Sequence, residues 1–216
     1  MATTIQAAHD RALEIPAGMD YEAFLDWLDE DTHAEWVDGQ VILMSPASRE
    51  HQTVAGFLFK ALSEFASERE AGEVFHAPFQ MKIPVRPSGR EPDVLFVAKD
   101  RCHLIRDTYL DGPADLVVEV ISKESRGRDT LDKREEYEQS GVREYWLVDP
   151  ERRELTALRR IGTQFVEERT GRGRFESAVL PGLWLEADWL WSQPPPSLQF
   201  VLRAWRRDPA HGTSGV

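Results

Sequence analysis

Hydrophobic residues in the middle of the chain fall into short continuous runs bounded by turn residues. Three such runs, at residues 94–97, 115–122 and 143–148, are rich in β-branched and aromatic side chains and predict buried strands. Two other segments repeat apolar residues at helical spacing, about 50–68 and about 129–141, and the second ends at a glycine. Strands thus alternate with helices at the centre of the chain.

The flanking segments predict smaller elements. We expect a short helix capped by Asp20, a hairpin with Asp38-Gly39 at its turn, one strand over 74–85, a polar excursion over 99–113, strands at 154–159 and 164–168, and a last helix over 198–205. The order predicts an α/β domain with a mixed sheet. We expect this single domain over 19–192, with a flexible arm at 1–18 and a proline-rich segment and tail at 193–216.

Two carboxylates stand where a strand is expected to be buried. Asp93 enters the first run and Glu119 lies inside the second, so the two fit neighbouring strands. Burying an unpaired carboxylate costs several kcal/mol unless a cation offsets its charge. Carboxylate oxygens suit Mg²⁺ or Mn²⁺, which polarise phosphoryl oxygens and activate water. The pair predicts a metal-dependent site for phosphoester chemistry.

Acidic residues are concentrated at the start of the chain. The formal net charge is −12; residues 1–75 hold 4 Lys and Arg against 15 Asp and Glu, and the remainder holds 22 against 23. The later part can therefore carry a basic patch for nucleic acid, although a solvated face of mixed charge explains the same count.

Composition excludes several classes of protein. The single cysteine, Cys102, excludes an intrachain disulfide and a multi-cysteine metal site. No apolar segment approaches 18 residues, so we expect a soluble cytoplasmic protein with no membrane partner.

The sequence resembles a known group of nucleases. Pro92-Asp93 followed by Glu119-Val120-Ile121 resembles the PD-(D/E)XK nuclease core, with Ile121 where that core usually has lysine. More closely, the chain resembles the Uma2-type (DUF820) family of predicted endonucleases over about residues 20–190. The matching positions are 115–122, Arg128-Asp129, Lys133, Tyr137, 141–150, Glu35 with Asp38-Gly39, His51 and 181–183.

This resemblance implies a restriction endonuclease-like fold and a Mg²⁺- or Mn²⁺-dependent endonuclease that hydrolyses phosphodiester bonds in DNA. It implies that Asp93 and Glu119 bind the metal, and that Glu35 supports the site or completes a second one. In this family the lysine lies on the following helix, which here indicates Lys133. Asp129 is one helical turn before it, although such a pair also occurs on exposed helices.

Other polar residues are weaker candidates for the same site. Lys82, on the strand before Asp93, is a rival for the lysine role, and Gln80 shares its face of that strand. Lys123 stands where the family usually has proline, and we expect a loop cation there. His51, in the first turn of a helix, is a further candidate.

Two other functions fit the sequence. Ile121 and the acidic first third favour a catalytically degenerate nuclease fold that serves as a binding or regulatory module, in which Glu119 and Lys133 form a structural ion pair. A hydrolase of small phosphorylated molecules is a third option, without a dedicated phosphate loop. Trp184, Trp189 and Trp191 indicate packing, stacking on bases or a homodimer contact.

Overall fold

The computed structural model describes residues 18–29 and 31–208; residues 1–17 of the expected arm at 1–18 and residues 209–216 of the expected tail lie outside this range. The helical elements are α1 (Tyr21–Trp27), α2 (Arg49–Glu68), the 3₁₀ helix η2 (Lys99–Leu104), the π-helix η3 (Arg128–Asp132), α3 (Lys133–Ser140), α4 (Ala187–Trp191) and α5 (Leu198–Arg207). The strands are β1 (Ala34–Val37), β2 (Gln40–Leu43), β3 (Gly72–His76), β4 (Gln80–Ile83), β5 (Ser88–Arg90), β6 (Val94–Ala98), β7 (Tyr109–Leu110), β8 (Leu116–Val120), β9 (Glu144–Asp149), β10 (Glu154–Ile161), β11 (Gln164–Thr170), β12 (Arg174–Glu176) and β13 (Trp184–Glu186).

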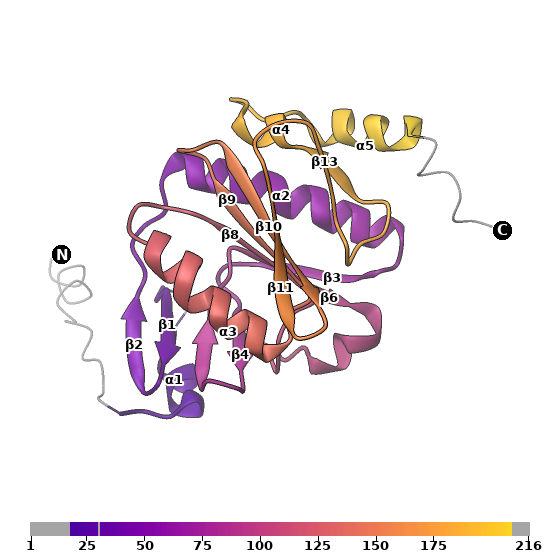
Figure 1. The fold of residues 1–216 in the computed structure, drawn as a ribbon. Helices are drawn as coiled ribbons and strands as arrows, with labels where there is room; N and C mark the ends of the chain where they lie inside the picture. Colours follow the sequence, from indigo (N-terminus) through magenta and orange to yellow (C-terminus); the bar gives the residue numbers. More distant parts are fainter. Residues whose placement is uncertain (1–17, 30, 209–216) are drawn as a thin grey trace, which may run out of the picture.

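A six-stranded mixed sheet lies at the centre of the molecule (Figure 1). Its strand order is β11-β10-β9-β8-β6-β3, with β8 and β9 parallel and the other neighbours antiparallel. The expected α/β fold with a mixed sheet is confirmed. The strands after Asp93 and around Glu119, β6 and β8, are direct neighbours as predicted.

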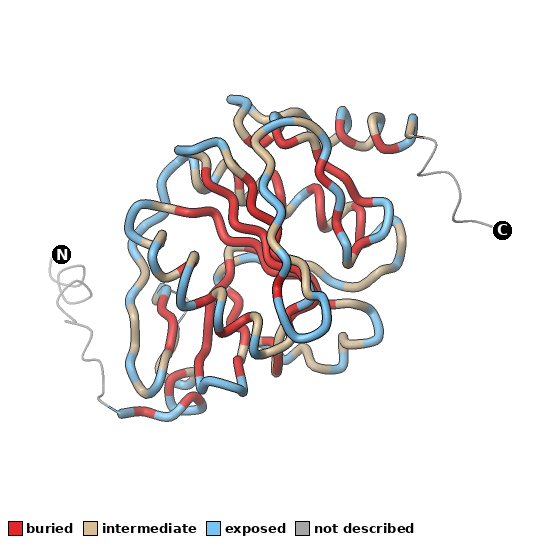
Figure 2. Tube along the Cα trace, in the orientation of Figure 1, coloured by how far each residue is buried: buried red, intermediate tan, exposed pale blue. Residues whose placement is uncertain are grey.

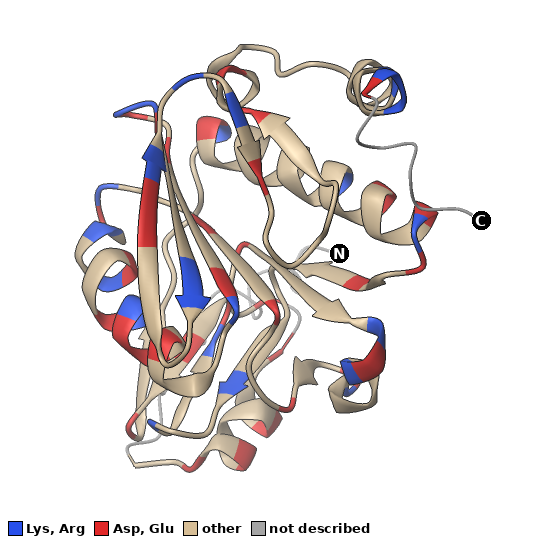
Figure 3. Cartoon of the chain, turned by 45° about the vertical axis from the view of Figure 1, so that its right-hand side comes forward, with Lys and Arg blue, Asp and Glu red and all other residues tan. Residues whose placement is uncertain are grey.

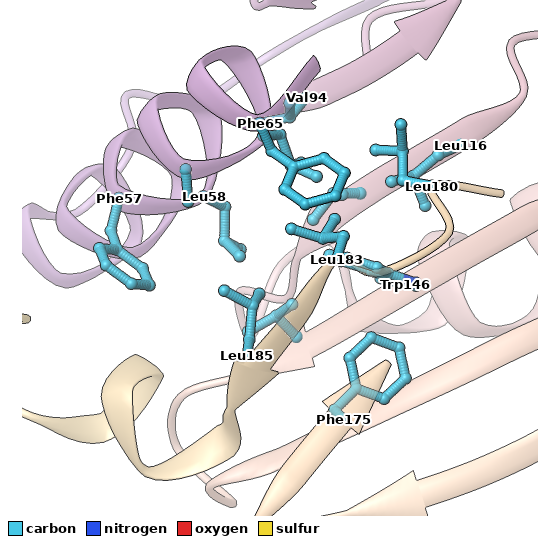
Figure 4. Close-up of a cluster of buried hydrophobic side chains, with 14 of the residues drawn as sticks. Phe57, Leu58, Phe65, Val94, Leu116, Trp146, Phe175, Leu180, Leu183 and Leu185 are labelled. Atoms are coloured by element: carbon cyan, nitrogen blue, oxygen red, sulfur yellow. The ribbon is translucent and has the colours of Figure 1, made fainter. Parts of the chain in front are cut away.

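Alternation along these strands gives each face of the sheet its own core, and the central strands are buried on both faces (Figure 2). One face packs against α2, the β12–β13 hairpin, α4 and α5 (Figure 4). The other face packs against α3 and a second sheet of five strands, ordered β2-β1-β5-β4-β7. The candidate site lies between these two sheets and α3.

The N-terminal elements follow the expected local rules. The Asp20 side chain caps α1 by accepting a hydrogen bond from the Ala23 N–H at 2.8 Å. Asp38 and Gly39 both have positive φ, at 50° and 80°, as the two-residue hairpin turn between β1 and β2 requires. Pairing of β1 with β5 then places the N-terminal hairpin in the same sheet as Arg90.

Two of the expected segments differ from the structure. The single strand predicted over 74–85 is wrong: β3 and β4 belong to different sheets, with Pro78 between them. Proline has no N–H for a strand ladder, so the chain leaves one sheet and enters the other there. The excursion over 99–113 contains η2 and the short strand β7, which joins the second sheet.

The last helix continues the first core past residue 192. The ring of Trp205 on α5 lies 5.3 Å from that of Phe65 on α2, and its indole N–H donates to the Trp184 carbonyl at 2.7 Å. The rings of Trp184 and Trp189 lie 5.4 Å apart, so these two aromatics pack within the chain. Within the described residues, none of the helices has the length and apolar character to cross a membrane.

Two glycines should respond in opposite ways to a methyl group. A Cβ on Gly89 would stand 2.2 Å from the Tyr21 ring, whereas one on Gly56, inside α2, would meet nothing within 4 Å. We expect Gly89→Ala to lower the free energy of unfolding by about 1–3 kcal/mol through overpacking. Gly56→Ala should raise it by up to about 1 kcal/mol through helix propensity.

Denaturant titration of both variants measures these changes. Equal midpoints for the two variants would contradict the packing of Tyr21 on β5.

Candidate active site

The two candidate metal ligands meet at one end of β6 and β8. Glu119 lies on the face of β8 that also carries Val117 and Ile121, which points to α3 and the second sheet. Continuing the Val94–Val118 register by one residue places Asp93 opposite Glu119. The Asp93 carboxylate accepts the backbone N–H of Val120 at 2.7 Å, which fixes it at the strand end. The predicted juxtaposition of Asp93 with Glu119 is therefore present.

Lys133 is the lysine that the fold brings to Glu119. It is the first residue of α3, and its side chain is 1% exposed. The Nζ atom lies 2.6 Å from Glu119 Oε1, 2.8 Å from Glu35 Oε1 and 3.5 Å from Asp129 Oδ1. The Asp129–Lys133 pair thus faces the interior, and the alternative of an exposed helix pair is wrong.

The charges around Lys133 shift its pKa and that of Glu119. Burial acts to lower the pKa of Lys133, but the carboxylates of Glu119, Glu35 and Asp129 outweigh it, so that pKa lies well above its ordinary value. Burial raises the pKa of Glu119, and Lys133 opposes this rise. The ammonium of Lys133 is therefore retained inside the cluster.

Tyr137 joins the cluster from the next turn of α3, as its place in the motif suggests. Its hydroxyl donates to Glu119 Oε1 at 3.2 Å, beside the lysine contact. Burial, followed by the charges of Glu119 and Glu35, raises the pKa of the Tyr137 hydroxyl. Tyr137 therefore stays a neutral hydrogen-bond donor.

Glu35 reaches the site from β1 and is held by cations on three sides. Arg90 NH1 donates to Glu35 Oε2 at 2.8 Å, Lys133 contacts the other oxygen, and Arg128 Nε lies 3.6 Å away. Burial acts to raise the pKa of Glu35, but the charges of Lys133, Arg90 and Arg128 lower it to about 2. The Glu35 side chain is fully buried.

Arg90 and Glu136 form a second buried pair that the sequence did not identify. Arg90 donates to both oxygens of Glu136, from Nε at 2.8 Å and from NH2 at 2.6 Å. A signal was available: Asp129, Lys133, Glu136 and Tyr137 follow one another at spacings of four, three and one, so they share one face of the helix. A polar stripe facing a sheet needs partners, and Arg90 supplies one.

His51 contacts the site from the first turn of α2. Its Nε2 lies 3.1 Å from Asp93 Oδ2, so His51 helps to orient that carboxylate. Burial acts to lower the His51 pKa, but the hydrogen bond and charge of Asp93 and the charge of Asp129 raise it overall. Asp129 Oδ1 is buried, and among the described residues its ion-pair partner is Lys133 at 3.5 Å.

Gln80 lies at the edge of the site. Its amide donates to the Ala34 carbonyl at 2.9 Å and to Glu91 Oε2 at 3.1 Å. Glu91 also pairs with His33 at 3.0 Å. Gln80 therefore connects β4 to β1, the strand of Glu35, and its recorded hydrogen bonds go to these groups rather than to Asp93 or Glu119.

The two rival lysines lie elsewhere. Lys82 pairs with Glu22 of α1 at 3.2 Å and lies over the Tyr21 ring, so its proposed role at the site is wrong. It fails because Lys82, although on the same face of β4 as Gln80, lies two residues farther along the strand, next to α1. Lys123 is 78% exposed and lies 3.7 Å from Glu151, which agrees with the expected loop cation.

The oxygens in this cluster fit a divalent cation with water ligands. In the described part of the chain there is no group of three His, Cys, Asp or Glu side chains in metal-binding geometry. Mg²⁺ needs only one or two carboxylates because it keeps several waters. Asp93 Oδ1 and Glu119 Oε2 have no recorded hydrogen bond or ion pair among the described residues, so each carboxylate retains one oxygen for such an ion.

Comparisons with known proteins agree with this geometry. The profile of a family described as "Uma2: Putative restriction endonuclease" matches residues 21–188. A crystal structure described as "a putative nuclease belonging to DUF820" from Anabaena variabilis has a TM-score of 0.69 and 13% identity, covering 80% of this chain and 97% of that one. At this identity the likeness concerns the fold. No curated protein gives a significant match.

The low pKa of Glu35 predicts how stability depends on pH. Its folded pKa of about 2 lies below the ordinary 4.5. The stabilisation that ionised Glu35 gives the folded state is therefore complete above pH 4.5 and is lost as the pH falls through about 2. We expect the difference in free energy of unfolding between wild type and Glu35→Gln to shrink by on the order of 3 kcal/mol between pH 5 and pH 2.

Urea titrations at several pH values measure this difference. Glu124→Gln, which changes an exposed glutamate, is the control and should show little pH-dependent difference from wild type. A Glu35→Gln difference that stays constant with pH would contradict the ionised, cation-held Glu35.

Proposed function

Because the chain belongs to the Uma2 family, we propose that it is a Mg²⁺-dependent endonuclease that hydrolyses phosphodiester bonds in DNA. One observation carries this proposal most directly: three carboxylates surround the buried Lys133, and a fourth, that of Asp93, stands opposite Glu119 at the end of two central strands. They are Glu35, Asp93, Glu119 and Asp129. Carboxylates gathered at one strand end offer the oxygen ligands that Mg²⁺ prefers.

Asp93 and Glu119 are the residues that would hold the metal. Their carboxylates face each other across β6 and β8, and each keeps one oxygen free of recorded contacts within the described chain. When bound, Mg²⁺ would polarise the phosphoryl oxygen and lower the pKa of a water. Mn²⁺ has the same preference for oxygen ligands and serves as the laboratory substitute.

The protein's own side chains support hydrolysis in distinct ways. The raised pKa of Lys133 keeps it as an ammonium, so it can orient the attacking water and stabilise negative charge that develops at phosphorus. It is not a general base in this state. Glu35 and Tyr137 hold this ammonium and Glu119 in place, and His51 fixes Asp93.

Other expectations about the protein remain predictions. DNA is the substrate by analogy with the wider nuclease superfamily. A homodimer and a cytoplasmic location were expected from the composition and are predictions as well. The homodimer was expected from the C-terminal tryptophans, and Trp184 packs on Trp189 within the same chain.

A catalytically degenerate binding module is the second candidate. The observation in its favour is that Lys133 already contacts both Glu119 and Glu35, as a structural ion pair would. This alternative requires that the carboxylates bind no divalent cation and that the protein does not cleave DNA. Metal titration therefore separates the two candidates.

The proposal is tested by calorimetric titration of Mn²⁺, run beside nicking of supercoiled plasmid. Asp93→Asn keeps an acceptor for the Val120 N–H but removes a carboxylate. We expect at least about 100-fold weaker metal binding and 10²–10³-fold slower nicking. Asp26→Asn, on the exposed side of α1, is the matched control and should match wild type.

The outcomes separate the hypotheses. Metal binding by wild type without nicking would retain the metal site and reject the nuclease activity. Neither binding nor nicking by the folded wild-type protein would support the degenerate module instead.

A further inference from the structure

A hollow lies outside the candidate active site. It has a volume of about 430 Å³ and lies between the β9–β10 turn, the loop from β11 to β12, and α4. Its lining residues are Arg152, Arg153, Gly171, Arg172, Asp188, Trp191 and Ser192. Three guanidinium groups with one carboxylate make a local positive site in a chain whose net charge is −12.

Two of these arginines are available to a ligand. Arg153 and Arg172 are exposed and, within the described residues, neither side chain has a recorded ion pair. Arg152 has only a 3.7 Å contact with Asp149, a carboxylate that Arg126 already binds. The positive charge of the hollow is therefore not neutralised by the protein itself.

The floor of the hollow is held in place by short contacts. Trp191 donates its indole N–H to the Gly171 carbonyl at 3.0 Å. A Cβ on Gly171 would stand 2.9 Å from the Arg153 carbonyl, so the two loops approach closely only because glycine is present there. Asp188 accepts the Gly173 N–H at 3.3 Å, which engages the lone acid of the lining.

The hollow lies toward the same end of the central sheet as the candidate site. In the parallel pair β8–β9, Ile121 N–H donates to the Val148 carbonyl at 2.7 Å, so the two strands end side by side. Arg126, in the loop after β8, binds Asp149 and lies 3.3 Å from Glu151 of the β9–β10 turn. Figure 1 shows this turn and the start of the α3 region on one side of the molecule, and Figure 3 shows basic residues in these loops.

We propose that the hollow binds a backbone phosphate of the nucleic acid, away from the phosphodiester bond that is cleaved. The ligand class rests on the proposed function. Arginine binds phosphate through charge and paired N–H donors, and a nucleic acid repeats that group along its length. A polymer, unlike a free nucleotide, can contact the hollow and the candidate site together, which favours it as the ligand.

The test is the binding of a fluorescent duplex, measured by anisotropy in EDTA at several salt concentrations. The variant is Arg153→Gly with Arg172→Ala; glycine suits position 153, whose φ is +50°. Arg203→Ala with Arg207→Ala removes the same charge from the exposed surface of α5 and is the matched control. Thermal unfolding verifies that both variants fold, and Arg172→Glu alone is a second probe of the hollow.

We expect the hollow variant to bind the duplex at least about tenfold more weakly than the control, with a salt dependence reduced by about one to two ions. Equal affinities of the two folded variants would overturn the proposal. Inorganic phosphate and ADP are titrated in parallel. Binding of either one that is lost in the hollow variant, with duplex affinity unchanged, would also overturn it and assign a small phosphate ligand instead.

Catalysis and docking fail separately in this design. Asp26→Asn, on the exposed side of α1, should bind and nick the duplex like wild type. If wild type does not nick DNA but the hollow variant still loses affinity, the proposed activity fails and the docking site remains. If wild type nicks DNA and the hollow variant binds like the control, the proposed activity stands and the docking site is rejected.

Discussion

The buried ammonium of Lys133 is the interaction on which the candidate site depends. Removing one cation from water and placing it among Glu119, Glu35 and Asp129 is favourable only if all the contacts are made together. Those carboxylates come from β8, β1 and the π-helix before α3, so the ammonium joins the central sheet, the N-terminal sheet and α3. The geometry of the site therefore depends on the packing of the two sheets, and the packing depends on the contacts in the site.

Arg90 extends the same principle to the second sheet. It binds Glu35 and Glu136, so β5, β1 and α3 share one network of charged groups with almost no exposed surface. Buried pairs of this kind contribute little net stability compared with apolar packing, but breaking one leaves an uncompensated charge. This network favours one arrangement of the two sheets. The hollow between the β9–β10 turn, the β11–β12 loop and α4 adds positive charge at the surface.

Much of this was readable in the sequence because the strongest signals are local. The runs that became β6, β8 and β9 are continuous and apolar, and Glu119 is conspicuous as a charge within one of them. Lys133 was located by the family resemblance, since periodicity alone permits an exposed helix pair. Lys82 was misjudged because alternation gives the two faces of a strand without saying what covers each part of a face. Helical spacing places Glu136 on the same face as Lys133, but the pairing of Arg90 with Glu136 and the arginine hollow depend on contacts between distant segments, which spacing along the chain does not encode.

The most direct test of the account is a double-mutant cycle between Lys133 and Glu119, measured as free energy of unfolding at pH 7. We expect Lys133→Met to lower the free energy of unfolding by about 3–5 kcal/mol because it leaves buried carboxylates without their cation. The double variant with Glu119→Gln should recover part of that loss, with a coupling energy of about 1–3 kcal/mol. A Lys133→Met variant as stable as wild type, with additive effects in the double variant, would contradict a buried ammonium at the centre of the site.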